Sequence, residues 1–381
     1  MSKKMKRNNI LHICLTAGYT ESSGYQEVVL SKQNALDGKK TSVISTNVIR
    51  RGNKLVKTKP GLIITKEGVN VYRLKSNVTN RNIRKFYDVK DLIYKIKPDV
   101  IFFHGLCSWE LNTVLKYKKK NMYVKLYVDN HADFNNSAQN LFLYIFHKFM
   151  WLYFIKKALP YLDKLFYICD SSKNYLQKMY KIPYEILEFY PLGGVLFDEV
   201  KWKRCREIRR RELNLSNNDI LFLHSGKMDS LKRTKDVLKA FQKIENDNAK
   251  IILIGAIPYD LEKDIMSLVD KDERVRFLGW KTFDELREYM CASDVYVQFG
   301  SMSASLQQSI CCGCSVMVYP YDSYKPFVKD NGYFIKTVDD MVVCVQNIID
   351  NPNCLVEMRK NSFDIAKNLL DYRKLAARLY E

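Results

Sequence analysis

The chain has 381 residues, of which 47% are hydrophobic, and its formal net charge is +20. This length exceeds one average domain and predicts two. The apolar content is ample for packed cores, which excludes a chain without a hydrophobic core. Ten cysteines without paired spacing, together with the lack of a signal peptide, predict a reducing cytosol rather than a disulfide-bonded secreted domain. Cys311, Cys312 and Cys314 are crowded, but no second Cys/His pair lies nearby, so we interpret them as packing and not as a zinc site.

The positive charge is concentrated in one half of the chain. Residues 1–200 contain 33 Lys and Arg against 16 Asp and Glu, whereas residues 201–381 contain 29 against 26. This asymmetry predicts two domains with different partners. A basic surface suits anionic lipid, nucleic acid or a phosphorylated substrate, although lysine usage for solubility alone stays an alternative.

Short strands alternate with helices in the first half, which predicts a parallel sheet covered on both faces. Helices are expected at Gln26–Asp37 and Tyr87–Ile96. The predicted strands are Asn9–Leu15, Thr41–Thr46, Val69–Leu74, Asp99–His104, Tyr123–Asp129 and Lys164–Cys169. Ligands bind beyond the carboxyl ends of such strands, so the segments that follow them are candidates for a site. These segments are Gly18–Gly24, His104–Glu110, Asn130–Asn136 and Asp170–Ser172.

Two histidines and one glutamate of these segments are candidate site residues. His131 follows the strand YVKLYVD, where it could act as a general acid or base or bind a sugar hydroxyl. A histidine bonded to a neighbouring backbone group is the alternative. His104 and Glu110 are candidates for acceptor binding, with a helix-capping role for Glu110 as the competing interpretation.

Leu141–Ile155 (LFLYIFHKFMWLYFI) is the most hydrophobic run of the chain. It is too short to span a membrane, and His147 and Lys148 interrupt it. An aromatic helix with flanking lysines can lie in a membrane interface. We expect this half of the chain to lie near a membrane, with the helix itself mostly in the core.

A second strand series begins after Tyr190–Phe197 (YPLGGVLF), whose proline and paired glycines are typical of a hinge, and after a charged helix at Lys201–Leu213. The predicted strands are Ile220–His224, Lys250–Gly255, Val275–Leu278, Asp294–Gln298, Cys314–Tyr319 and Tyr333–Ile335. The chain is therefore predicted to form two doubly wound domains, residues 1–195 and 196–360. Residues 361–381 are expected to form a helix that crosses back to the first domain.

Two segments of the second half have the composition of a phosphate site. Gly226 forms a tight turn after a strand, and Lys227 and Lys232 flank the following loop, which suits a diphosphate. Ala304–Cys312 is a predicted helix that ends at Gly313 and whose first turn has only small residues. The open N–H groups of such a turn favour an anion.

The order of these motifs resembles family 4 of the glycosyltransferases (glycosyl transferases group 1), most clearly from Asn214 to Ile335. The resemblance includes ILHICLTAG at residues 10–18 and PLGGVLFDE at residues 191–199. It implies an α/β chain with the GT-B fold, in which two Rossmann-like doubly wound domains face each other across a cleft, the first binding the acceptor and the second the nucleotide sugar. It also implies His131 at the catalytic centre. The donor-binding residues that it implies are Gly24, Gly226, Lys227, Lys232, Gly279, Trp280, Ser303, Ala304, Ser305 and Gln308.

This chain departs from the family pattern at one place. The family carries two glutamates with seven residues between them, and the corresponding positions here are Gly300 and Gln308. Gln308 can still bond a ribose hydroxyl, but Gly300 cannot replace a carboxylate that contacts the sugar. The site is therefore either reorganised around groups such as Ser301 and Ser303 or impaired.

The resemblance implies a retaining, metal-independent glycosyltransferase without a cofactor, whose donor is a UDP- or GDP-linked sugar. Its acceptor would be a saccharide, lipid-linked or free, in surface polysaccharide or glycoconjugate synthesis. We expect a cytoplasmic protein, with peripheral attachment to the inner face of the cell membrane as an option, and no nucleic-acid partner. The alternative is a non-catalytic GT-B protein that binds a sugar nucleotide or a partner glycosyltransferase.

Overall fold

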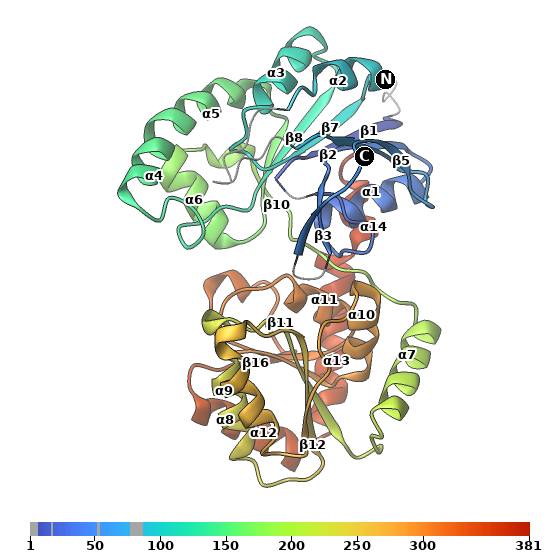
Figure 1. Ribbon diagram of the computed structural model, residues 1–381, viewed down its shortest axis with the longest axis vertical. Coiled ribbons are helices and arrows are strands. Elements are labelled where there is room, and N and C mark those ends of the chain that lie inside the picture. The colour runs from blue at the N-terminus through green and yellow to red at the C-terminus, as the bar shows by residue number, and fades with distance from the viewer. Residues whose placement is uncertain (1–6, 17, 52–53, 77–86) are drawn as a thin grey trace. The chain divides into compact units, whose positions relative to one another are not determined.

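The computed structural model describes residues 7–16, 18–51, 54–76 and 87–381, which divide into two compact units (Figure 1). Unit 1 comprises the chain up to Pro191 together with Tyr372–Glu381, and unit 2 comprises Leu192–Asp371. The first boundary thus lies four residues before the expected one. The chain returns to unit 1 at Tyr372, whereas the return was expected at residue 361.

Unit 1 is built on an eight-stranded sheet in the order β10-β9-β8-β7-β1-β2-β6-β5. All neighbours are parallel except β5 and β6, which pair antiparallel at one edge. The strands are β1 (Asn9–Cys14), β2 (Lys40–Thr46), β5 (Gly61–Ile64), β6 (Asn70–Leu74), β7 (Val100–His104), β8 (Lys125–Asn130), β9 (Lys164–Tyr167) and β10 (Leu187–Phe189). A separate antiparallel ribbon consists of β3 (Val48–Arg51) and β4 (Lys54–Lys57). The six strands predicted for this half are all present.

The helices of unit 1 cover this sheet. Its α-helices are α1 (Gln26–Leu36), α2 (Lys90–Ile96), α3 (Leu111–Lys120), α4 (Leu141–Phe146), α5 (Leu152–Ala158), α6 (Asp170–Tyr180) and α14 (Tyr372–Ala377). The short helical turns η1 (His147–Trp151), η2 (Leu159–Tyr161) and η3 (Tyr184–Ile186) connect them. The last helix, α14, packs against α1, so the C-terminal segment completes the first sheet's cover. The core lies on the strands β1, β7 and β8, where residues such as Ile101 and Leu126 are fully buried.

Unit 2 contains a six-stranded, fully parallel sheet in the order β13-β12-β11-β14-β15-β16. Its strands are β11 (Ile220–Lys227), β12 (Ala249–Ala256), β13 (Val275–Phe277), β14 (Val295–Gln298), β15 (Ser315–Val318) and β16 (Gly332–Phe334). Its helices are α7 (Glu199–Glu212), α8 (Thr234–Gln242), α9 (Tyr259–Val269), α10 (Phe283–Ala292), α11 (Ser305–Cys311), α12 (Val338–Asp350) and α13 (Cys354–Ile365), with the turns η4 (Ser230–Lys232), η5 (Asp322–Tyr324) and η6 (Ala366–Leu370). Strand order reverses at β11 and β14, which confirms the predicted doubly wound fold.

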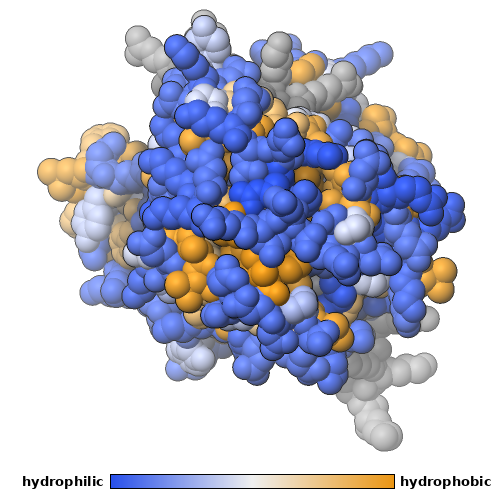
Figure 2. Space-filling model, turned by 90° about the horizontal axis from the view of Figure 1, so that it is seen from below, coloured by the Kyte–Doolittle hydropathy of each residue, from blue (hydrophilic) through white to orange (hydrophobic). Residues whose placement is uncertain are grey.

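The most hydrophobic run of the sequence is not mostly core, contrary to the prediction. It forms α4, η1 and α5, and α4 has no buried residue. Phe142 and Phe149 are 75% and 72% exposed, whereas Trp151 and Ile155 on the following turns are buried. Figure 2 shows apolar side chains gathered at its left edge, the side on which α4 lies in Figure 1. None of the helices in the described part of the chain is long and apolar enough to cross a membrane.

One buried carboxylate ties the helices of unit 2 to its sheet. Asp294 lies just before β14, is 4% exposed and accepts the backbone N–H of Leu221 on β11 at 2.9 Å. Three arginines from α7 and α13 pair with it: Arg206 at 2.5 Å, Arg210 at 3.2 Å and Arg359 at 2.9 Å. A single acidic group therefore compensates three partly buried cations.

Replacing Asp294 with alanine should lower the free energy of unfolding of unit 2 by about 3–5 kcal/mol, because the three guanidinium groups lose their shared counter-ion. Urea unfolding followed by circular dichroism measures this loss. The control is Asp284→Ala, since Asp284 is 78% exposed and pairs only with Arg287. That change should cost less than about 1 kcal/mol. Equal losses in the two variants would contradict the assignment.

Candidate functional site

A lysine ammonium is buried at the carboxyl end of the unit 2 sheet. Lys232 ends the turn η4 and is only 3% exposed. Its stem lies over Gly226, where an added Cβ would come within 3.3 Å of Lys232 Cε and 3.4 Å of Nζ. No carboxylate of the described residues lies within ion-pair distance of this ammonium, and Asp229 acts on it only at longer range. Lys232 is therefore a buried cation that can accept an anionic ligand.

Burial changes the acid–base properties of this lysine. Desolvation lowers the pKa of Lys232 to about 8, and the charge of Asp229 raises it only partly. Burial, together with the charge of Lys232, lowers the pKa of the neighbouring His224 to about 4. His224 is therefore neutral at physiological pH. An anion bound beside Lys232 would restore the usual preference for the charged form.

Three glycines form a floor without side chains next to this lysine. Gly226 on β11 is the register partner of Gly255 on β12, and the N–H of Gly255 donates to the carbonyl of Gly279 after β13 at 2.9 Å. All three have positive φ values of 125°, 147° and 67°. A Cβ on Gly255 would lie 1.9 Å from the carbonyl oxygen of Gly226, so this approach requires glycine. No side chain therefore projects from these three positions, and Gly255 is itself buried.

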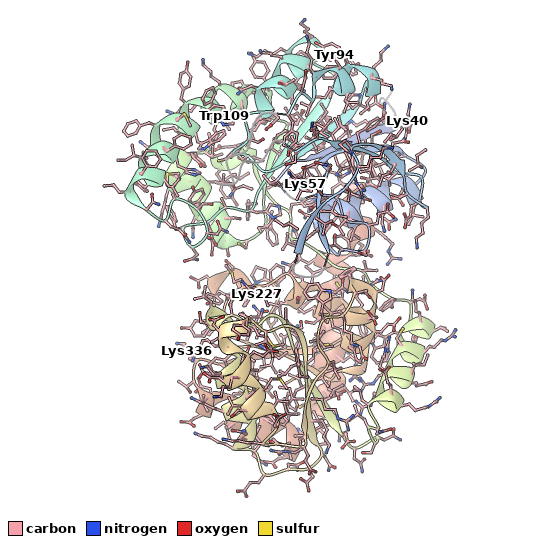
Figure 3. The ribbon with its side chains drawn as sticks, viewed as in Figure 1. Lys40, Lys57, Tyr94, Trp109, Lys227 and Lys336 are labelled. Carbon is pink, nitrogen blue, oxygen red and sulfur yellow. The ribbon has the colours of Figure 1, made fainter. Side chains whose placement is uncertain are left out.

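Two further predicted donor-binding residues, Lys227 and Trp280, lie on the surface beside this floor. Lys227 ends β11 (Figure 3), and its side chain is 70% exposed, 4.0 Å from Asp229. Trp280 follows Gly279 and is 55% exposed. Lys227 and Trp280 therefore remain available to a ligand.

The loop of small residues before α11 is only partly open. The backbone N–H of Ser303 donates to the hydroxyl of Tyr324 at 3.2 Å, and that of Ser305 donates to Ser303 Oγ at 3.3 Å. Gln298 at the end of β14 donates to the same Tyr324 hydroxyl at 2.5 Å. Two of the N–H groups proposed for phosphate binding are therefore already satisfied, and the role of Ser303, Ala304 and Ser305 stays a prediction.

Close packing explains why a glutamate is missing at position 300. A Cβ on Gly300 would lie 2.0 Å from the carbonyl oxygen of Leu231 and 2.7 Å from the carbonyl carbon of Lys232. The next residue, Ser301, donates its N–H to that Leu231 oxygen at 2.9 Å. The backbone of η4 thus occupies the space that a carboxylate side chain at position 300 would need.

The second departure, Gln308, has a structural role. It is 4% exposed, its Oε1 accepts the N–H of Val195 at 2.9 Å, and its Nε2 donates to the carbonyl of Val195 at 3.0 Å. The neighbouring Gln307 accepts the N–H of Gly193 at 2.7 Å. Both glutamines therefore fasten residues 193–195 to α11. Donor binding by Gln308 stays a prediction and would need a further hydrogen bond.

Substitution of Gly300 should destabilise unit 2 rather than restore a family-like site. Gly300→Ala is expected to cost about 3 kcal/mol, at the upper end for overpacking, because the clash is with backbone. Gly300→Glu should unfold at still lower denaturant. Gly279→Ala is the matched control, since no atom lies within 4 Å of its added Cβ and only the left-handed backbone opposes it. That control should lose about 1–2 kcal/mol. A Gly300→Glu variant as stable as the native chain would refute this explanation.

In unit 1, the predicted catalytic histidine is held by a buried carboxylate. Asp129 on β8 is 1% exposed, and its Oδ2 lies 3.3 Å from Nε2 of His131, whose side chain is 43% exposed. The same Oδ2 lies 2.7 Å from Nδ1 of His104, the register partner of Asp129 on β7. The other oxygen, Oδ1, accepts the N–H of Gly105 at 2.7 Å. The structure thus brings His104 and His131 together through one carboxylate.

The pKa shifts in this group follow from these contacts. Burial alone would raise the pKa of Asp129, but His104 and His131 hold it well below its usual range. Burial alone would lower the pKa of His131, but the charge and hydrogen bond of Asp129, with a contribution from Glu27, raise it. His131 is consequently a stronger base than an ordinary histidine.

The two other predicted unit 1 residues have different surroundings. Glu110 is 2% exposed, and its carboxylate accepts the N–H of Tyr87 at 2.9 Å and the hydroxyl of Ser108 at 2.5 Å. It precedes α3 but makes no side-chain capping bond to that helix. Gly24 lies in the segment between β1 and α1. Acceptor binding by His104 and Glu110, and donor binding by Gly24, stay predictions.

Sequence reasoning did not identify Asp129, Gly255 or His12 as site residues. Asp129 and His131 are two residues apart at a strand end, a spacing that places both on one face, so this pair could have been found. His12 is a polar residue inside the apolar strand β1, which is also a recognisable signal. No group of three or more His, Cys, Asp or Glu side chains in the described ranges could hold a metal ion.

Comparison with known proteins agrees with the predicted resemblance. Residues 206–364 match the family model of glycosyl transferases group 1. An uncharacterized glycosyltransferase of Methanocaldococcus jannaschii is 23% identical over 328 residues, which cover 77% of this chain and 79% of that protein.

Two solved structures extend the likeness to both units. Sucrose-phosphate synthase from Thermosynechococcus elongatus superposes with a TM-score of 0.67 at 16% identity and covers 98% of this chain and 97% of its own. HepE of Anabaena, solved with UDP, has a TM-score of 0.68 at 13% identity over 97% of this chain and 98% of its own. These similarities confirm the GT-B fold.

Proposed function

Residues 206–364 of the second unit match the family model of glycosyl transferases group 1, and from this match we propose that the protein transfers a sugar from a nucleotide-sugar donor to a saccharide acceptor. The buried, unpaired ammonium of Lys232 is the observation that carries the proposal. A cation without a counter-ion in a low-dielectric setting interacts strongly with an anion, because the interaction is little screened by water.

We propose that the diphosphate of the donor lies on the glycine floor, with Lys232 and Lys227 as its cationic partners. These cations would stabilise the charge that develops on the leaving diphosphate. The exposed ring of Trp280 suits stacking against the nucleobase. UDP is our first choice of nucleotide, since HepE was solved with UDP, and GDP is the second.

His131 is our proposed catalytic residue, in contact with the reacting sugar. We further propose that transfer retains the anomeric configuration, needs no metal, and serves surface polysaccharide or glycoconjugate synthesis in the cytoplasm. A retaining reaction of this class needs charge stabilisation at the leaving group more than a strong nucleophile, which fits the cationic character of the unit 2 site.

A second candidate function is sugar-nucleotide binding without catalysis. The packing at Gly300 favours it, because this position has neither a carboxylate nor space for one. The native chain should be incubated with UDP- and GDP-linked sugars and with saccharide or lipid-linked acceptors, and nucleotide release and product followed. Transfer that falls about 10²–10⁴-fold in His131→Ala, with unchanged nucleotide affinity, supports catalysis. Binding without turnover of any pair supports the second candidate.

The exposed apolar side chains of α4 and the following turns suit a membrane surface. We define the α4 surface as Leu141, Phe142, Ile145, Phe149 and Tyr153, which are between 47% and 75% exposed. Lys148, Lys156 and Lys157 lie on the same segment. Apolar side chains bordered by lysines favour the interface of an anionic bilayer. We therefore propose peripheral attachment to the inner face of the cell membrane through the α4 surface.

Lys232→Ala should weaken binding of UDP by about 1–3 kcal/mol, the range for hydrogen bonds to a charged group. Lys227→Ala should have a smaller effect, because its ammonium is exposed and screened. Calorimetry measures both affinities, and far-UV circular dichroism checks that each variant is folded. Unchanged affinity in a folded Lys232→Ala variant would reject the diphosphate site.

The same site should make nucleotide binding depend on pH. Below about pH 8 Lys232 is charged in the free protein, so affinity should be constant there. As pH rises further, the free protein must take up a proton to bind the anion, and affinity should fall by up to about tenfold per unit. In Lys232→Arg this fall should disappear, because arginine stays charged. A native chain whose affinity is flat between pH 7.5 and about 9.5 would contradict the buried cation.

Binding of the chain to vesicles containing anionic lipid should require the α4 surface. Phe142→Ser together with Phe149→Ser should reduce cosedimentation at least about fivefold, because each large apolar side chain contributes about 1.5–3 kcal/mol when buried. The control is Tyr259→Ser, which removes an aromatic side chain that is 93% exposed on α9 of unit 2. Higher salt should weaken binding by the native chain. Cosedimentation that is equal for neutral and anionic vesicles, or equal for both variants, argues against this surface.

A further inference from the structure

A chain of five polar side chains runs through unit 1 and ends at His131. Its members come from α1, β1, β7, β8 and the loop after β8, and they are Asn34, His12, His104, Asp129 and His131. The first four are buried, with exposures from 0% to 7%. The sequence analysis assigned candidate roles to His131 and His104 and to none of the other three.

The hydrogen-bond donors in this chain can be assigned from one end. Asn34 Nδ2 donates to the carbonyl of Ala376 at 3.4 Å, which leaves Oδ1 facing Nε2 of His12 at 2.9 Å. An amide oxygen only accepts, so His12 carries its proton on Nε2. Burial and the charge of His104 lower the pKa of His12 to about 3, and it is therefore neutral. Its Nδ1 must then be an acceptor.

This assignment fixes the state of the next histidine. Nε2 of His104 lies 3.1 Å from the accepting Nδ1 of His12, so it must donate. Nδ1 of His104 faces Oδ2 of Asp129 at 2.7 Å, and a carboxylate also only accepts. Both nitrogens of His104 thus carry protons, which makes it an imidazolium. His104 and Asp129 form a buried ion pair whose charges cancel.

The His104–Asp129 ion pair determines the tautomer of the exposed histidine, His131. The carboxylate of Asp129 accepts from His104 and from the N–H of Gly105, and its Oδ2 faces Nε2 of His131, which must donate as well. Neutral His131 therefore holds its proton on Nε2 and has its lone pair on Nδ1. The loop is fixed independently, because Asn136 donates to the carbonyl of His131 at 3.1 Å and Asp133 accepts the N–H of Asn135 at 2.8 Å.

We propose that Asp129 and His104 are positioning residues that hold His131 in the Nε2–H tautomer and present its Nδ1 as a hydrogen-bond acceptor for a sugar hydroxyl. That the ligand is a sugar rests on the proposed function. The arrangement of Asp129, His104 and His131 that fixes the tautomer, which we call the device, does not. The charged groups around it are His104 on β7, Asp129 on β8 and Glu27 on α1, with neutral His12 on β1. Because the charge of His104 compensates that of Asp129, the carboxylate stays ionised and can accept a hydrogen bond from His131.

Nitrogen NMR of the full chain, labelled with ¹⁵N only in its five histidines, tests the device. His104→Gln and His131→Gln identify the two signals by their loss. With His131 neutral, we expect both nitrogens of His104 to donate hydrogen bonds, and His12 and His131 each to carry one proton on Nε2. His131 should take up its second proton at a pH above the ordinary value of about 6.5. A bare nitrogen on His104, or a proton on Nδ1 of neutral His131, overturns the proposal.

Asp129→Asn should remove the acceptor of His104 Nδ1 and lower the titration midpoint of His131. Asp133→Asn is the matched control, because Asp133 is a carboxylate of the same loop that is 6% exposed and accepts the N–H groups of Asn135 and Asn136. It should leave both histidine signatures unchanged. If Asp129→Asn does not fold, the titration of the native chain still decides the assignment. Equal shifts in both variants overturn it.

Turnover measurements distinguish the contribution of Asp129 to catalysis from its effect on the tautomer of His131. With a donor and acceptor identified by nucleotide release, Asp129→Asn should reduce kcat about 10²-fold or more and leave UDP affinity unchanged. Full activity in a folded Asp129→Asn variant overturns the positioning role. A native chain with the expected histidine signatures and no turnover of any donor refutes the proposed function and leaves the tautomer assignment standing.

Discussion

Backbone contact between the loop after β14 and the turn η4 organises the anion site of unit 2. Ser301 donates to the carbonyl of Leu231, and Gly300 has no side chain because that carbonyl fills the space. The contact fixes η4, and η4 in turn holds Lys232 over Gly226. A glutamate in the loop would push η4 away and would place a negative charge near the ammonium. Loss of the family carboxylate and burial of the lysine are therefore two results of one packing arrangement.

The two candidate sites, one in each unit, differ in how their buried charges are paired. In unit 1 the charged side chains at the strand ends are fully paired, since Asp129 serves His104, His131 and the N–H of Gly105. In unit 2 the ammonium of Lys232 has no ion-pair partner among the described residues. A paired network fixes geometry, whereas an unpaired buried cation stores an unfavourable desolvation energy that only a ligand can relieve. The first arrangement suits a group that orients a reactant, and the second suits a group that binds one.

The strands could be predicted well because buried parallel strands are short apolar runs. Such runs can be recognised in the sequence without knowing which strands pair with them. His131 follows such a run directly and Lys232 lies five residues after one, and their roles in catalysis and donor binding stay predictions. The role of Gly255 could not be predicted, because it depends on an approach by Gly226 from a neighbouring strand. The edge strand β5 was missed although its sequence GLII is apolar, because it is only four residues long. For α4, the apolar run suggested a core helix, and only the three-dimensional packing shows that most of its side chains face solvent.

The altered acidity of Lys232 also affects its covalent chemistry. An ordinary lysine, with a pKa near 10.4, is almost entirely protonated at neutral pH and is a poor nucleophile. Lys232, with a pKa of about 8, is mainly charged at pH 7, but its uncharged fraction is roughly one-tenth and far exceeds that of an ordinary lysine. Small electrophiles such as carbon dioxide or acylating metabolites should therefore modify it faster than the exposed lysines. Such a modification would remove the cation from the anion site, and an occupied site would protect the amine.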